Sequence, residues 1–297
     1  MSIRPVQSHT KATPTMEGAG VHLHRAFGFG KTADFDPFLL FDDFRGDSPE
    51  LYTAGFPWHP HRGIETITYV LAGTVEHGDS MGNRGEITAG DVQWMTAGRG
   101  IVHQEMPRGD AAGRMHGFQL WANLPSSEKM TAPRYQEILA GQIPVVTDDD
   151  GTQVRVVCGS FWGQTGPVDG IAANPTYLDV YVPPGTRKSL PIDTRLHAFA
   201  YVFDGSGTFG AASEPRPVPT EDAYGRTMAE VDNRSLVLFS SGDEVTVETR
   251  DEGVRFLLVS GKPLQEPVAW HGPIVMNTRE EIETALRDLR EGTFLDG

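Results

Sequence analysis

Two short stretches of the chain each carry a pair of side chains that can bind a metal ion. His59 and His61 stand two residues apart, and His103 and Glu105 repeat this spacing later in the chain. Residues two apart on a β-strand point to the same face, so each pair can direct two ligands at one spot. If the two strands lie side by side, three imidazoles and a carboxylate converge. That donor set suits a first-row divalent metal and leaves open coordination positions.

The residues between the two pairs predict short strands that could position them. Glu65–Val75 and Gly85–Met95 are rich in β-branched residues and alternate in polarity. Glycines mark the turns, at positions 78, 82, 85 and 90. Short strands with tight returns are typical of an antiparallel barrel or jelly roll.

Two longer motifs contain these pairs, HPHRGIETITYVLAG at 59–73 and GDVQWMTAGRGIVHQEMP at 90–107. Together with segments 36–44, 116–124 and 272–278, they resemble the pirin family of the cupin superfamily. The resemblance implies an all-β bicupin fold of two stacked antiparallel β-barrels, with a metal in the first barrel alone. It also implies the ligand set His59, His61, His103 and Glu105.

The identity of the carboxylate ligand has an alternative. The general cupin pattern places a glutamate shortly after its histidine pair, and Glu65 stands at that position. On a regular strand Glu65 would face the same way as the histidines. In the pirin pattern the fourth ligand is the glutamate two residues after the later histidine, which is Glu105. We therefore predict Glu105, with Glu65 behind the ligands or bound to Arg62 or Arg99.

The second half of the chain weakly repeats the first. Tyr69–Gly73 aligns with Tyr201–Gly205, and Ala89–Val92 aligns with Ser241–Glu244. The four ligand positions then fall on Pro191, Asp193, Arg255 and Leu257. Arginine has no lone pair to offer a cation, so we expect the second barrel to be metal-free.

These patterns predict two domains. Residues 1–130 would form the N-terminal barrel with the metal site, and 131–297 the metal-free C-terminal barrel with a short helix. Thr278 and Glu281 form a capping box for that helix, which presents an apolar stripe of Ile282, Leu286 and Leu289. The insert 211–228, rich in proline and acidic residues, is expected to be an exposed excursion.

Composition restricts the partners and the compartment. The 297 residues carry a net charge of −15, which would repel nucleic-acid phosphate, so we expect no direct nucleic-acid binding. One cysteine excludes an intrachain disulfide and fits a reducing compartment. We see neither a signal core nor an apolar run of about 18 residues, and expect a cytoplasmic protein without membrane contact.

The resemblance also implies an activity. Pirin-like proteins are associated with quercetin 2,3-dioxygenase activity, in which dioxygen opens the central ring of a flavonol and releases carbon monoxide. The expected cofactor is one divalent metal, with Fe(II) preferred and Ni, Mn, Co or Cu as alternatives. Glu105 would serve as ligand and as catalytic base. The alternative is a non-enzymatic, metal- or redox-responsive regulator that binds a protein partner.

A further histidine pair, His22 and His24, also has alternating spacing. No second ligand pair is expected beside it. We predict that this pair lies on a surface and does not bind a metal.

Overall fold

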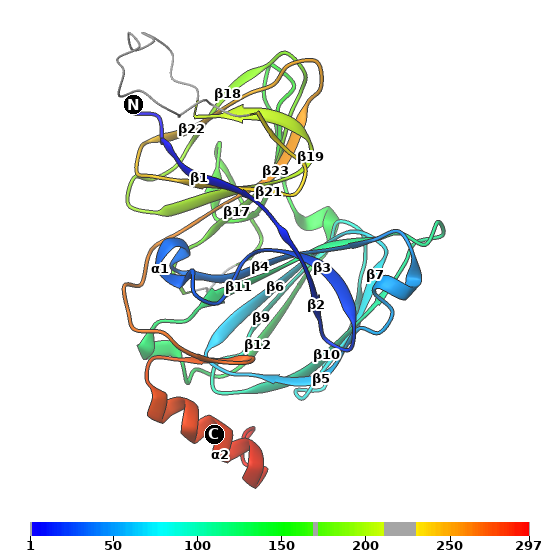
Figure 1. Ribbon diagram of the computed structural model, residues 1–297, viewed down its shortest axis with the longest axis vertical. Coiled ribbons are helices and arrows are strands. Elements are labelled where there is room, and N and C mark those ends of the chain that lie inside the picture. Colours follow the sequence, from blue (N-terminus) through cyan, green and yellow to red (C-terminus); the bar gives the residue numbers. More distant parts are fainter. Residues whose placement is uncertain (1, 169–171, 211–229, 297) are drawn as a thin grey trace. The chain divides into compact units, whose positions relative to one another are not determined.

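The computed structural model describes residues 2–168, 172–210 and 230–296, and most of them lie in antiparallel strands (Figure 1). The described residues form two compact units. Unit 1 contains Met1–Lys11, Pro144–Thr165 and Thr176–Gly261, and unit 2 contains Ala12–Ile143, Gly166–Pro175 and Lys262–Gly297. The prediction of an all-β chain with two antiparallel domains and a short C-terminal helix is confirmed. The insert 211–228 lies outside the described residues.

The two ends of the chain do not belong to the units that a domain boundary after residue 130 would give them. Residues up to Lys11 belong to unit 1, because β1 (Val6–Lys11) pairs with β21 (Ser235–Phe239). The segment from Lys262 onward belongs to unit 2. The domain boundary after residue 130 stays a prediction, and the contacts of the two chain ends do not follow it.

Unit 2 contains a large sheet and a smaller one. In spatial order the large sheet contains β12 (Arg134–Ile138), β9 (Val92–Thr96), β6 (Ile64–Ala72), β11 (Met115–Asn123), β4 (Phe38–Gly46), β3 (Val21–Phe27) and β2 (Thr13–Glu17). The smaller sheet contains β5 (Phe56–His61), β10 (Ile101–Arg108), β7 (Thr74–Asp79) and β8 (Arg84–Ile87). A hairpin of β24 (Ala269–His271) and β25 (Ile274–Met276) belongs to this unit, as do short helical segments at Thr32–Phe35 (α1), Pro49–Leu51, Ser126–Glu128 and Ala140–Gln142.

Each of the two predicted strand runs is interrupted by a turn. The run Glu65–Val75 is divided between β6 and β7 at Gly73, which has a φ of 79°. The run Gly85–Met95 is likewise divided between β8 and β9, with Gly90 at a φ of 93° in the connection. Glycine adopts this left-handed region without a steric cost, so the chain reverses at these two points.

Unit 1 has one main sheet around a hydrophobic core. Its central order is β1, β21, β19 (His197–Phe209), β23 (Val254–Gly261), β17 (Thr176–Val182), β14 (Gln153–Cys158) and β13 (Val145–Thr147). β18 (Arg187–Pro191), β20 (Glu230–Asp232) and β22 (Glu244–Glu248) pair at its side, and β15 (Ser160–Phe161) pairs with β16 (Gln164–Thr165). Buried valine, leucine and phenylalanine side chains fill the space between these strands.

The predicted C-terminal helix is present as α2 (Arg279–Glu291). Thr278 accepts a hydrogen bond from the Glu281 amide, and the Glu281 side chain accepts one from the Thr278 amide. Ile282 is buried, and Leu286 and Leu289 pack beside it, as the predicted stripe requires. None of the helices in the described part of the chain is long and apolar enough to cross a membrane.

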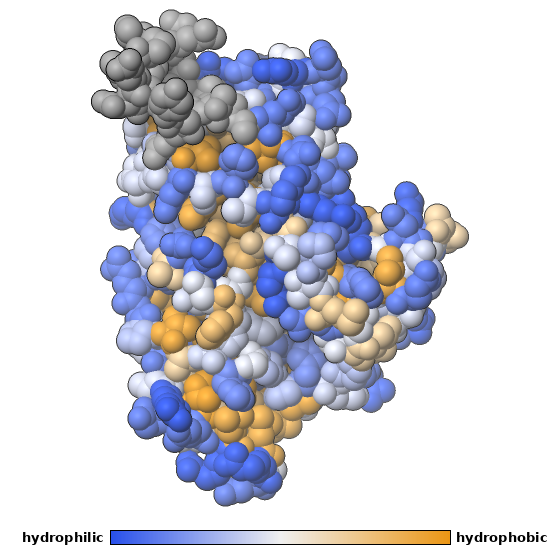
Figure 2. Space-filling model, in the orientation of Figure 1, coloured by the Kyte–Doolittle hydropathy of each residue, from blue (hydrophilic) through white to orange (hydrophobic). Residues whose placement is uncertain are grey.

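Hydrophilic side chains predominate on the face shown in Figure 2, in keeping with the charged composition of the chain.

Candidate metal centre

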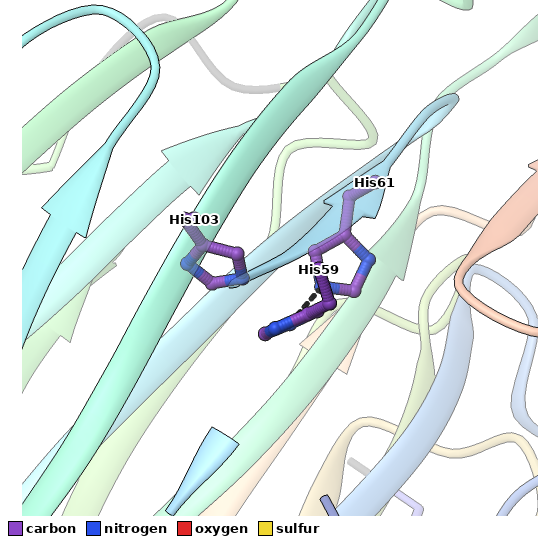
Figure 3. A group of neighbouring side chains, drawn as sticks. All are labelled: His59, His61 and His103. Atoms are coloured by element: carbon purple, nitrogen blue, oxygen red, sulfur yellow. Dashed lines mark hydrogen bonds between the residues drawn. The ribbon is translucent and has the colours of Figure 1, made fainter. Parts of the chain in front are cut away.

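Strands β5 and β10 bring the histidines of the two sequence motifs together. The strands are antiparallel, with His103 opposite His59 and Ile101 opposite His61. Figure 3 shows the three imidazole rings turned toward one another from these strands. One ring nitrogen from each histidine belongs to a group whose atoms all lie within 4.8 Å of one another. The convergence expected from the alternating spacing is therefore present for His59, His61 and His103.

The hydrogen bonds of His59 and His61 leave their Nε2 atoms free to bind a cation. His59 Nδ1 lies 2.9 Å from the Pro57 carbonyl oxygen, and His61 Nδ1 lies 3.0 Å from that of Pro273. A carbonyl oxygen only accepts, so both Nδ1 atoms donate and both neutral rings carry a lone pair on Nε2. These two Nε2 atoms are 3.1 Å apart, which is within hydrogen-bond distance (dashed line in Figure 3), but with both protons on Nδ1 the neutral rings have no proton to share between them. Two facing lone pairs repel each other, and a bound cation would remove that repulsion.

Protonation is a poor substitute for a metal at this position. Burial, and then the neighbouring His59, lower the pKa of His61 to about 3. Burial followed by the surrounding histidines His61, His59 and His77 also lowers the pKa of His103 well below its usual value. Neither ring nitrogen of His103 has a hydrogen-bond partner among the described residues, although both are buried. Neutral imidazoles with unused nitrogen lone pairs fit a first-row divalent metal.

Glu105 lies on the same face of β10 as His103. Alternate residues of this strand are buried, including Ile101, His103 and Glu105. Thr68 donates a hydrogen bond to Glu105 Oε1 at 2.8 Å. Burial raises the pKa of Glu105 to about 7, against the lowering effect of this hydrogen bond. Glu105 lines the same cavity as His59 and His61, but it falls outside the compact cluster of the three histidines.

Glu65 does not share the face that its position after His61 suggested. β5 ends at His61 and β6 begins at Ile64, so the two residues do not lie on one regular strand. Gly63 makes the turn between them at a φ of 79°, and a Cβ there would lie 2.0 Å from the Val275 carbonyl oxygen. On β6, Thr66 lines the cavity and Thr68 bonds Glu105, whereas Glu65 accepts from Thr96 on the opposite face.

A cavity of about 750 Å³ opens onto His59, His61 and Glu105. One part of its wall is aromatic, with ring centroids 5.0 Å apart for His61 and Trp121 and 5.9 Å apart for Trp121 and Trp270. Another part is charged, where Arg25 bonds Asp42 and Glu17. Apolar walls with a few polar groups are typical of sites for small organic molecules.

The segment after Lys262 contributes to this site in ways that were not predicted. Pro273 supplies the carbonyl oxygen for His61, and Trp270 lines the cavity. The buried Lys129 links this segment to the turn at Gly63, because its ammonium group donates to the carbonyl oxygens of Val275 and Gly63, at 2.9 and 2.8 Å. In the sequence, residues 272–278 were singled out because they resemble a pirin segment. That resemblance did not predict the contact with His61.

Arg62 also holds the C-terminal end in place. Its guanidinium donates to Asp288 at 2.7 Å and to the Phe294 carbonyl oxygen at 2.9 Å, and it lies over the Phe294 ring. Arg62 was one of two expected partners for Glu65, but in the structure it makes these contacts instead.

The pair His22 and His24 lies apart from the metal centre. His22 is exposed, and the neighbouring Leu23 and Arg25 are the residues of β3 that face the cavity. Alternation along the strand therefore turns His22 and His24 to the other side. The metal-ligand cluster found among the described residues does not contain them.

In unit 1 the aligned positions hold other interactions. Arg255 forms a two-point ion pair with Asp179, at 2.9 and 2.6 Å, and Asp193 bonds Arg195. Leu257 is buried. A metal-free unit 1 stays a prediction from the aligned sequences.

Comparison with known proteins identifies the family. The family model described as Pirin matches residues 20–122, and the one described as Pirin C-terminal cupin domain matches residues 177–295. A pirin-like protein of Caulobacter vibrioides is 43% identical over 295 residues, covering 99% of this chain and 100% of that protein.

Solved structures agree with this assignment. The crystal structure of quercetin 2,3-dioxygenase from Acinetobacter baumannii matches with a TM-score of 0.85 and 30% identity, covering 98% of each chain. The bacterial pirin YhhW from Escherichia coli, in complex with nickel(II), has the same fold, with a TM-score of 0.63 and 21% identity over 86% of this chain and 99% of that one. From the family models over both halves and the identity along nearly its whole length, the chain belongs to the pirin family.

Proposed function

We propose that the protein is a metal-dependent dioxygenase that opens the central ring of a flavonol such as quercetin. In this reaction both atoms of dioxygen enter the organic product, and one ring carbon leaves as carbon monoxide. The observation that carries the proposal is the facing pair of Nε2 atoms of His59 and His61 at a cavity large enough for a flavonol. Beside them lies His103, whose ring nitrogens have no hydrogen-bond partner in the described part of the chain. The similar Acinetobacter baumannii structure, named as such a dioxygenase, adds support.

The proposed ligands are His59, His61, His103 and Glu105. Three neutral imidazoles and one carboxylate leave a net positive charge on a divalent ion, which attracts an anionic oxygen ligand. When bound, the ion would supply Lewis acidity for a substrate hydroxyl and the redox chemistry that dioxygen requires. Fe(II) remains the first choice, and the complex of Escherichia coli YhhW with nickel(II) makes nickel the next ion to test.

Glu105 is the proposed catalytic base. A flavonol must lose the proton of its 3-hydroxyl group before dioxygen can attack the ring. A carboxylate beside the reacting hydroxyl can accept that proton, and burial raises the pKa of Glu105 in the metal-free protein. Thr68 holds Oε1 by donating to it, which orients the carboxylate and leaves Oε2 as the proton acceptor.

The aromatic wall has a binding role in this proposal. Trp121 stands edge-on to His61, with an interplanar angle of 85° and centroids 5.0 Å apart. Together with Trp270 it offers flat apolar surface next to the histidines. Stacking on such a surface would stabilise the binding of planar fused rings. Trp121 and Trp270 would also keep bulk water from the reacting carbon atoms of the substrate.

A reconstitution experiment tests the proposal. Metal-free protein is loaded separately with Fe(II), Ni(II), Mn(II), Co(II) and Cu(II), and oxygen uptake and carbon monoxide release are followed with quercetin. Equal consumption of oxygen and release of carbon monoxide with at least one ion is expected. Absence of both with every ion would overturn the enzymatic proposal and favour the alternative, a metal-responsive regulator with a protein partner.

A further inference from the structure

A charged group of three side chains forms one part of the cavity wall. Arg25 donates from Nε and Nη2 to the two oxygens of Asp42, at 2.8 and 2.7 Å. It also donates from Nη1 to Glu17 Oε1 at 2.8 Å. All three residues line the cavity that contains His59 and His61. We refer to Glu17, Arg25 and Asp42 as the acidic triad.

The acidic triad carries a net negative charge at neutral pH. Both oxygens of Asp42 accept hydrogen bonds from the guanidinium of Arg25, which is the arrangement of an ionised carboxylate, although burial raises the pKa of Asp42 to about 6. Arg25 stays protonated at any ordinary pH, and its positive charge is shared between two carboxylates. One negative charge is therefore left uncompensated. Glu17 is the accessible member, with 44% of its side chain exposed against 6% for Asp42.

Apart from the ion proposed at the histidines, the wall provides no positive charge that would offset the acidic triad. Among the residues that line the cavity, Arg25 is the only lysine or arginine. Leu40, Phe44, Phe56 and the aromatic wall make most of the remainder apolar. A molecule in this cavity therefore meets flat apolar surface and a set of carboxylate oxygens that accept hydrogen bonds and repel anions.

We infer that the acidic triad determines ligand specificity, by favouring planar aromatic molecules whose outer rings carry neutral hydrogen-bond donors, such as phenolic hydroxyls. The same group disfavours molecules whose outer rings carry a carboxylate or a sulfonate. The inference rests on the proposed function, because it assumes that the chelating end of the molecule faces the histidines. Beyond that function, the acidic triad would decide which flavonol-like molecules the cavity accepts.

A binding series tests this without turnover. Nickel(II)-loaded protein is titrated anaerobically with three probes, and quenching of tryptophan fluorescence is recorded. 3-Hydroxyflavone carries the chelating pair alone, quercetin adds hydroxyls on its outer rings, and the third probe is quercetin sulfonated on an outer ring. We expect quercetin to bind at least about tenfold more tightly than its sulfonate, because the sulfonate places a second negative charge near the acidic triad.

The informative variant is Glu17→Gln, which keeps the shape of the side chain and removes its charge. Glu17 is exposed enough for the fold to tolerate this change. The affinity for the sulfonate should rise by about twofold to fivefold, the scale of one partly exposed charge interaction. The affinity for 3-hydroxyflavone should stay unchanged. Glu86→Gln is the matched control, because this substitution removes the same charge. Glu86 is exposed on β8 and does not line the cavity.

The outcomes separate the two proposals. Equal binding of quercetin and its sulfonate, or no effect of Glu17→Gln on their ratio, would overturn the role of the acidic triad while leaving flavonol binding intact. Failure of all three probes to bind would overturn the flavonol proposal and this inference with it.

Discussion

His61 donates a hydrogen bond from Nδ1 to the carbonyl oxygen of Pro273, 3.0 Å away and 212 residues later in the chain. This bond selects the tautomer that presents Nε2 to a metal. Backbone carbonyls and carboxylates commonly serve histidine ligands in this way, and their loss typically costs tenfold to a hundredfold in metal affinity. The C-terminal segment of unit 2 is therefore part of the candidate metal centre, although it contributes no proposed ligand.

Lys129→Met should weaken both the fold and the metal centre. The ammonium group donates to Gly63, Asn123 and Val275, and its removal leaves these buried acceptors without that donor. We expect the free energy of unfolding to fall by about 2–4 kcal/mol, measured by urea denaturation. Metal affinity should fall by about tenfold or more, measured by competition with a chelating dye.

The exposed Lys262 provides a control for Lys129→Met. Lys262→Met should change the free energy of unfolding by no more than about 0.5 kcal/mol. If Lys129→Met lowers stability and leaves metal affinity unchanged, the C-terminal segment does not orient His61.

Single alanine substitutions of the histidines should abolish metal retention. His61→Ala or His103→Ala removes one of three converging imidazoles, and we expect metal affinity to fall by at least about 100-fold. Metal content after dialysis, measured by elemental analysis, checks this. His22→Ala removes an exposed histidine from the unrelated pair and should leave the content unchanged. Full metal content in both site variants would contradict the proposed ligand set.

Glu105→Gln tests the base. Glutamine has nearly the same shape and cannot accept the hydroxyl proton, so oxygen uptake with quercetin should fall by about 10²–10⁴-fold. Metal content is measured on the same sample, because loss of a ligand and loss of a base both reduce turnover. A variant that retains the metal and takes up oxygen at the full rate would remove Glu105 from the role of base.

Glu65 should make stability depend on pH. Burial raises the pKa of Glu65 from 4.5 to about 7, against the hydrogen bond from Thr96. The folded state holds this proton more tightly than the unfolded state. The contribution of Glu65 to the free energy of unfolding is therefore fully present below pH 4.5 and is lost as pH rises through 7. The total loss is about 3 kcal/mol.

The matched variant for this effect is Glu65→Gln, which cannot ionise. The difference in the free energy of unfolding between the two proteins should change in favour of the variant between pH 5 and pH 8, in urea denaturation. A constant difference across that range would show that Glu65 does not titrate there. Metal content should be the same in both, because Glu65 faces away from the histidines.

Removal of the metal should lower thermal stability. A ligand that binds the folded state alone stabilises it by about 2.7 kcal/mol at a free concentration 100 times its dissociation constant. Addition of a chelator should therefore lower the Tm of the loaded protein by several degrees. The His103→Ala variant should show no such shift, because it has no metal to lose. The same shift in both proteins would place the metal elsewhere.

Local patterns were sufficient to predict the β class and the helix cap, whereas the two predicted strand runs are each divided by a turn, at Gly73 and Gly90. Alternation at His103 and Glu105 correctly predicted that both side chains share one face of β10, since this depends only on the geometry of a single strand. The capping box of Thr278 and Glu281 was predictable for the same reason. The position of Glu65 was not, because the turn at Gly63 breaks the strand on which the extrapolation from His61 depended.

The surroundings of the histidines were decided by packing between distant segments. The contact between His61 and Pro273 joins β5 to the turn between β24 and β25, and the bonds of Arg25 to Asp42 and Glu17 join three different strands. Spacing along one strand states which side chains point the same way, and it carries no information on which other strand lies opposite. The convergence of His59, His61 and His103 could thus be predicted from the sequence alone, whereas the tautomer of His61 and the charge of the cavity wall arise only when the strands pack.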